Sequence, residues 1–119
     1  MIIRTNTGYR KYGSVPGYEH QVGIAIPLMN PEATGLPGAA EGAVLGDIEE
    51  IIRSSLEEQG VSLLVAVITT GGMREFVFYT REHHWVEQRV VELRQRITTH
   101  EMQLMIQLDK TWQVYAQLG

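Results

Sequence analysis

The chain has 119 residues, with 10 Lys or Arg against 14 Asp or Glu, and its formal net charge at pH 7 is −4. This length fits one domain that can fold on its own hydrophobic core, and a content of 44% hydrophobic and 20% charged residues excludes a disordered chain. The absence of cysteine excludes disulfides and thiol catalysis, and we find neither an apolar run of transmembrane length nor a secretory signal. We therefore expect a cytoplasmic protein that does not enter a membrane.

The first 19 residues differ from the rest in composition, because they carry three tyrosines and three basic residues against one acidic residue. We expect an N-terminal arm over residues 1–19, with a short strand at residues 2–5, and a folded domain over residues 20–119. Residues 20–28 alternate between large apolar and small or polar side chains, which predicts a strand. A loop rich in proline and glycine follows.

Apolar spacing then predicts the remaining elements. Spacings of three and four indicate amphipathic helices, alternation indicates strands, and Gly71-Gly72 favours a tight hairpin. The predicted elements are a helix over 41–59, strands over 61–70 and 73–80, a helix over 81–97, a strand over 101–108, and a last helical turn after Asp109 with Trp112 and Tyr115.

The resulting order, β-α-β-β-α-β, predicts an α+β fold. With right-handed crossovers it becomes a ferredoxin-like sandwich, in which both helices cover one face of a four-stranded antiparallel sheet. The residues expected between the sheet and the helices are Ile24, Ile26, Ile48, Ile52, Leu56, Val90, Leu93, Leu104 and Ile106.

Four stretches carry a pattern that can be compared with known families. They are Tyr-Glu-His-Gln-Val-Gly-Ile-Ala-Ile-Pro-Leu at 18–28, Asp-Ile-Glu at 47–49, Ile-Thr-Thr-Gly-Gly-Met-Arg-Glu-Phe-Val-Phe-Tyr at 68–79, and Trp112 with Tyr115. In this order they resemble a bacterial family called domain of unknown function 695. Lys110 departs from the family pattern, which often has a proline after the aspartate. The resemblance implies a ferredoxin-like domain, sometimes found beside a regulator of ribonuclease E activity, and it implies no established activity, cofactor or catalytic residue.

The predicted topology brings several possible metal ligands to one edge of the sheet. His20, His83, His84 and Asp109 would lie there, and imidazole and carboxylate groups suit zinc. A site formed by His20, His83 and Asp109 is therefore one hypothesis. We favour a solvated, polar helix start and expect no cofactor, because adjacent residues of a helix point about 100° apart and rarely chelate together.

The hairpin at residues 69–75 offers a possible anion site. Thr69, Thr70, Gly71, Gly72 and Arg74 supply hydroxyl groups, backbone N–H groups and a guanidinium group, which suit a phosphate or carboxylate. The alternative, which we favour, is that the two glycines only permit the tight turn.

Other activities have less support in the sequence. The serines lie in no nucleophile motif. The aromatic residues at 76–79 resemble part of an RNA-recognition motif, but a pI near 5.5 opposes phosphate binding and makes nucleic acid a disfavoured partner.

We therefore expect a non-catalytic protein-interaction or regulatory module. A small-ligand or enzymatic site at the hairpin or the histidine edge is the alternative, and an RNA-binding module comes third. The sheet face opposite the helices would be apolar, with Gly23, Ala25, Pro27, Met105 and one set of residues from the third strand. We expect a homodimer to cover this face, with the tyrosine-rich arm or an unknown protein partner as alternatives.

Overall fold

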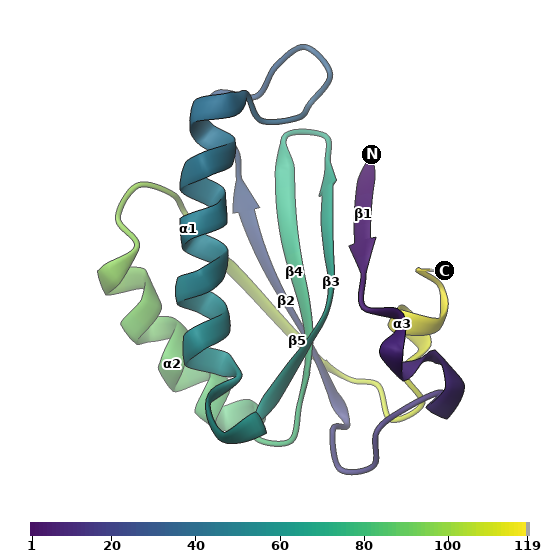
Figure 1. Ribbon diagram of the computed structural model, residues 1–119. Coiled ribbons are helices and arrows are strands. Elements are labelled where there is room, and N and C mark those ends of the chain that lie inside the picture. The colour runs from purple at the N-terminus through teal and green to yellow at the C-terminus, as the bar shows by residue number, and fades with distance from the viewer. Residues whose placement is uncertain (119) are drawn as a thin grey trace.

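The computed structural model describes residues 1–118 and has a five-stranded antiparallel sheet with two long helices on one face (Figure 1). The chain ends gather on the other side of the sheet, where α3 lies next to the segment that follows β1. In chain order the elements are β1 (Ile2–Thr5), η1 (Thr7–Tyr12), β2 (His20–Pro27), α1 (Ala39–Leu56), η2 (Glu58–Gly60), β3 (Ser62–Thr70), β4 (Met73–Thr80), α2 (His83–Arg96), β5 (Gln103–Leu108) and α3 (Gln113–Ala116), where η marks a 3-10 helix.

The predicted four-stranded ferredoxin-like sandwich is wrong. The sheet has five strands in the order β1-β3-β4-β2-β5, which is not the order of that fold. The additional strand is β1, which pairs antiparallel with β3 from Ile2 opposite Thr69 to Thr5 opposite Ala66. This pairing satisfies backbone N–H and C=O groups that would otherwise lie on an open edge of β3. A four-residue strand is too short to reveal such a partner by its periodicity.

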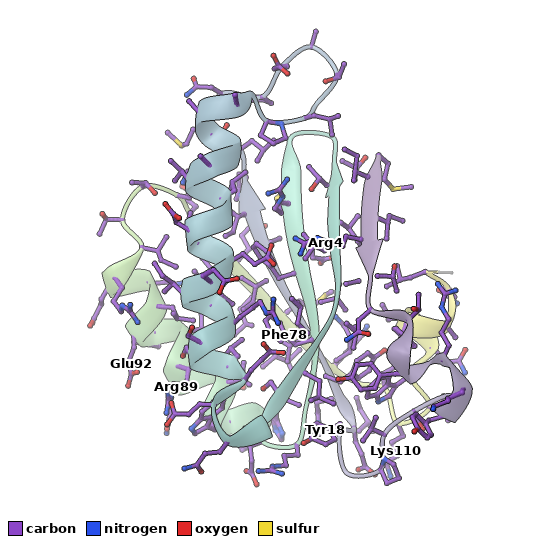
Figure 2. All side chains as sticks on the ribbon, viewed as in Figure 1. Arg4, Tyr18, Phe78, Arg89, Glu92 and Lys110 are labelled. Carbon is purple, nitrogen blue, oxygen red and sulfur yellow. The ribbon has the colours of Figure 1, made fainter. Side chains whose placement is uncertain are left out.

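The face under α1 and α2 holds the larger apolar core. Alternate residues of β2 and β4 meet the apolar sides of the two helices there, and side chains fill the space between the layers (Figure 2). Seven of the nine predicted core residues are buried; Leu104 and Ile106 are only partly buried. Both belong to β5, which is an edge strand and therefore has a neighbour on one side only. The fully buried members of this core include Val22, Ile24, Ile26, Leu45, Ile52, Leu56, Phe76, Phe78, Val86 and Val90.

The opposite face carries an aromatic core covered by the chain's own ends. The Trp112 ring stacks on Tyr79 with ring centroids 4.1 Å apart and an interplanar angle of 11°. Its Nε1–H donates to the carbonyl oxygen of Tyr18 at 2.8 Å. Tyr9 meets Trp112 edge-on at 5.6 Å, whereas Tyr12 is exposed. The tyrosine-rich segment, one of the covers considered from the sequence, thus packs on the β3–β4 part of this face.

None of the helices within residues 1–118 has both the length and the apolar character needed to cross a bilayer.

Candidate functional site

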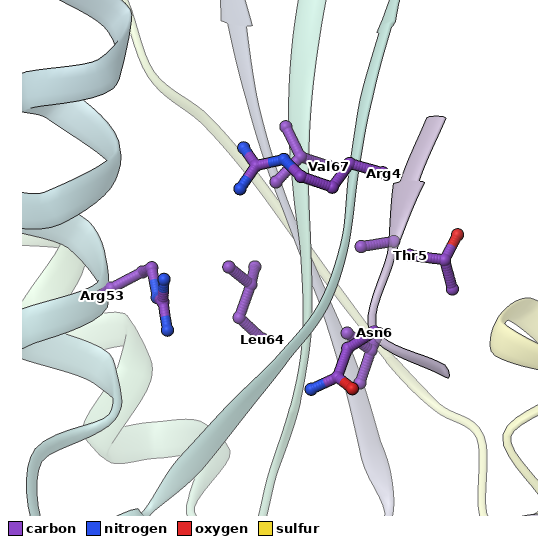
Figure 3. A pocket seen from close by; sticks show the side chains of 8 residues that line it. Arg4, Thr5, Asn6, Arg53, Leu64 and Val67 are labelled. Atoms are coloured by element: carbon purple, nitrogen blue, oxygen red, sulfur yellow. The ribbon is translucent and has the colours of Figure 1, made fainter. Parts of the chain in front are cut away.

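A pocket of about 190 Å³ lies on the helix-covered side, between α1 and the β1–β3 edge of the sheet. Arg4 enters it from β1 and Arg53 from α1, while Leu64 and Val67 of β3 lie between them (Figure 3). Thr5 and Asn6 line the end nearest the turn after β1. A β-bulge between Leu64 and Ala66 shifts the register of β3 at this place. The pocket therefore combines two guanidinium groups with an apolar floor.

Arg4 forms the main ion pair of the site. Its position opposite Val67 directs its side chain to the helix-covered face, as Figure 2 shows. There Nη1 donates to Oε2 of Glu49 at 2.9 Å and Nη2 donates to Oε1 at 2.5 Å, so the pair is bidentate. Hydrogen bonds from Arg4 hold the pKa of the Glu49 carboxyl below its usual value, against the opposing effect of burial. Glu49 is thus an internal counter-ion, buried under the edge of the sheet.

Two more arginines lie near this carboxylate. Arg53 donates from Nε to Oε1 of Glu57 at 3.0 Å, and its Nη1 is 4.0 Å from Oε2 of Glu49. Arg74 donates from Nε to Oγ1 of Thr69 at 2.9 Å. Burial lowers the pKa of Arg74, and the charge of Arg4 acts in the same direction while Glu49 opposes it. Three guanidinium groups thus act on Glu49, and Arg53 also lies near the carboxylates of Glu57 and Glu50.

The structure divides the predicted hairpin site into two parts. Thr69 and Arg74 join each other on the helix-covered face, near Glu49. Gly71 and Gly72 form the turn with φ of 58° and 78°. The N–H of Gly72 donates to the carbonyl of Gly35 at 3.0 Å, so the preceding loop already occupies this donor.

Thr70 is exposed beside that turn. An anion nest formed by all five predicted residues stays a prediction, and the turn geometry offers it fewer free donors than the sequence suggested.

The predicted metal ligands lie in different environments. The rings of His20 and His83 stack at 4.1 Å with an interplanar angle of 25°, and His84 lies 4.1 Å from His83. Burial lowers the pKa of His20, and the neighbouring His83 adds to this effect. Because the lone pairs of an imidazole lie in its ring plane, nearly parallel rings direct them along separate lines.

Asp109 is engaged elsewhere. Its carboxylate accepts hydrogen bonds from the Tyr79 hydroxyl at 2.7 Å and from the N–H groups of Gln113 and Val114 at 2.8 and 3.0 Å. Across residues 1–118, no group of three or more His, Cys, Asp or Glu side chains is arranged to hold a metal ion. The site of His20, His83 and Asp109 stays a prediction that needs rearranged side chains.

Sequence reasoning missed a buried pair at the start of α1. The side chains of His100 and Glu41 are 5% and 8% exposed, and His100 Nε2 lies 2.7 Å from Oε2 of Glu41. The N–H groups of Met29 and Asn30 donate to the same carboxylate at 2.6 and 3.0 Å. Although burial acts to raise it, these hydrogen bonds lower the pKa of Glu41. The pair joins two loops to the helix, and 59 residues of separation give no local pattern that predicts it.

The comparison with family models supports the resemblance found in the sequence. The model described as "Family of unknown function (DUF695)" matches residues 1–118. No match to a curated protein or to a solved structure was found. With almost its whole length matched, the chain belongs to the DUF695 family.

Proposed function

We propose that this protein is a non-catalytic interaction module that pairs with a second copy of itself along the outer edge of β5. One observation carries the proposal. β5 has the sequence Gln-Leu-Met-Ile-Gln-Leu, without charge or proline, and lies at the edge of the sheet. Proteins usually protect edge strands with charges, prolines or bulges, because unpaired backbone groups recruit other strands. An unprotected edge of this kind favours strand addition.

The two edges of the sheet differ in this respect. β1 is four residues long and carries Arg4, which pairs with Glu49. β5 is six residues long, and its Met105 and Leu108 are 53% and 60% exposed. Exposed apolar side chains next to an uncharged edge support an interface.

The pattern of β5 is compatible with pairing to itself. A two-fold axis normal to the sheet would pair the two β5 strands in antiparallel orientation, with even-numbered residues of one copy opposite even-numbered residues of the other. The helices of both copies would then lie on the same side of the joined sheet. Leu104, Ile106 and Leu108 of both copies would then form one continuous apolar row. The result would be a ten-stranded sheet with its interface at the strand edges.

This arrangement replaces the sheet-face contact expected from the sequence. Trp112 and Tyr9 cover the β3–β4 part of that face, which leaves less apolar area there for a partner. The carboxylate of Asp109, one of the predicted metal ligands, also supports a non-catalytic role, because it caps the last helical turn.

Light scattering after gel filtration tests the proposal. The protein should have a mass of about twice 13.4 kDa. A variant with Met105→Lys and Leu108→Lys should be monomeric, because charges on an edge strand oppose pairing. Ile2→Lys is the matched control, because Ile2 is 55% exposed on the opposite edge, and it should stay dimeric. A monomeric wild-type protein, or a dimer that only Ile2→Lys dissociates, would contradict the proposal.

A further inference from the structure

Beyond its role as an interaction module, we infer that the pocket between Arg4 and Arg53 binds a small oxyanion, the phosphate or carboxylate group of a small molecule. The first support is the geometry of the pocket. The two guanidinium groups extend from opposite walls, one on β1 and one on α1 (Figure 3). Planar guanidinium groups match the oxygen pairs of carboxylates and phosphates, which makes arginine the usual residue for such recognition.

The second support is the number of donors left available. Arg53 uses Nε for Glu57. Within residues 1–118, the Nη groups of Arg53 make no hydrogen bond to the protein, and Nη1 lies 4.0 Å from Oε2 of Glu49. The Nη N–H groups of Arg53 are therefore available to a ligand in the pocket that it lines.

The third support is the orientation of the two arginines. Glu49 accepts both hydrogen bonds from Arg4, and Glu57 accepts one from Arg53. These carboxylates hold the guanidinium groups in place at the pocket. Binding of an anion therefore costs little side-chain freedom.

Size and lining restrict the ligand. A pocket of about 190 Å³ is smaller than the usual 300–1,000 Å³ of drug-sized sites. Leu64 and Val67 provide an apolar floor for a short hydrocarbon group. A single phosphate or carboxylate with a few carbon atoms fits this description.

The carboxylate of Glu49 should weaken the binding of an anion in the pocket. It occupies Nη1 and Nη2 of Arg4 and therefore competes with an incoming anion for the same donors. Its replacement by glutamine keeps the shape of the side chain but removes the competing charge. The Glu49→Gln variant should thus bind the ligand more tightly than the natural protein.

Titrations followed by amide NMR test the inference, with inorganic phosphate in one series and acetate in the other. The amides of residues 64–67 and 5–6 should shift and saturate in at least one series. Arg53→Gln should weaken this binding at least about tenfold, because it removes a charge-assisted hydrogen bond. Arg89→Gln is the matched control, because Arg89 pairs with Glu58 away from the pocket lining and should leave the affinity unchanged.

A second pair of variants separates a local contact from a change in net charge. Glu49→Gln should tighten binding severalfold, and Asp47→Asn, which removes the same charge from an exposed position of α1, should not. If Glu49→Gln does not fold, the Arg53→Gln and Arg89→Gln comparison decides alone. The inference is overturned if neither anion gives saturable shifts at these amides, or if Arg53→Gln binds as well as Arg89→Gln.

Discussion

The two faces of the sheet are covered by different means. α1 and α2 cover one face with aliphatic side chains at regular helical spacing, and within that core Val22, Ile52 and Val90 are fully buried. The chain ends cover the β3–β4 part of the other face with aromatic side chains held by specific hydrogen bonds. Tyr115 donates from its hydroxyl to the carbonyl of Asn6 at 2.5 Å, and Trp112 donates to Tyr18, so each contact joins the two ends of the chain. The comparison shows that packing on the first face depends on the buried apolar area and on the shapes of the side chains. Packing on the second face also depends on a few hydrogen bonds.

The largest effect is expected at the centre of the aromatic face. Trp112→Ala should lower the free energy of unfolding by about 3–5 kcal/mol, because it removes the buried ring that stacks on Tyr79. Denaturant titration monitored by circular dichroism measures this change. Tyr12→Ala is the control, because Tyr12 is exposed on the same segment and should change stability by less than about 0.5 kcal/mol. Equal effects of the two variants would show that the chain ends are not part of the cooperative core.

On the helix-covered face, the stability losses of two aliphatic truncations should differ between the centre of the core and the edge strand β5. Ile48→Ala should cost about 2–5 kcal/mol, because Ile48 is buried between α1 and the sheet. Leu104→Ala should cost less, because Leu104 lies on the edge strand β5 and is only partly buried. Urea titrations of both variants test this order. This order applies to the monomer and should be measured at low protein concentration. In the proposed dimer a second copy covers β5, so the cost of Leu104→Ala should increase with protein concentration. A larger loss for Leu104→Ala than for Ile48→Ala at low concentration would contradict the expected order.

The smallest effect is the pH dependence of the stabilisation by Asp109. This carboxylate accepts hydrogen bonds at the aromatic face, so its contribution should depend on pH. Although burial acts to raise it, hydrogen bonds from Val114, Tyr79 and Gln113 lower the pKa of Asp109. Because the native pKa lies below the unfolded one, Asp109 stabilises the fold fully above the ordinary Asp pKa, and this contribution is lost as the pH falls through the lowered native value. Asp109→Asn should cost about 1–3 kcal/mol at neutral pH and have little effect at acidic pH.

Denaturant titrations at pH 7 and at successively lower pH measure this dependence. Ile48→Ala serves as the reference, because an aliphatic truncation should cost nearly the same at each pH. A constant cost for Asp109→Asn over the whole range would show that its carboxylate is not the stabilising group.

Sequence reasoning succeeds for the helix-covered face and fails at the edges. Periodicity is a property of consecutive residues, so the spacing alone places Ile24, Ile48 and Val90 in the core, where all three are buried. A short strand is also expected at residues 2–5, but nothing in four residues indicates which strand they join. The fifth position in the sheet, and with it the failure of the four-stranded fold, follows from a pairing across more than 60 residues of chain.

The candidate site is predictable only in part. The sequence singles out Thr69 and Arg74 together, and they do bind each other. Glu49 stands out only as part of the family motif at residues 47–49 and as one acid on a charged helix, because nothing local distinguishes it from Glu50. Its partner Arg4 lies 45 residues away, so only tertiary packing identifies the pair.

The sequence by itself determined the residue types available for each layer: the apolar spacing of the two helices, the glycine turn at 71–72, and the absence of charged residues at positions 103–108. The tertiary structure alone decided which strands became edges, that the chain ends cover one face, and that Arg4, Arg53 and Arg74 surround one carboxylate. The physical reason is that periodicity acts over one turn or one pleat, whereas edge pairing, aromatic stacking and ion pairing depend on which distant segments the fold brings within a few ångströms.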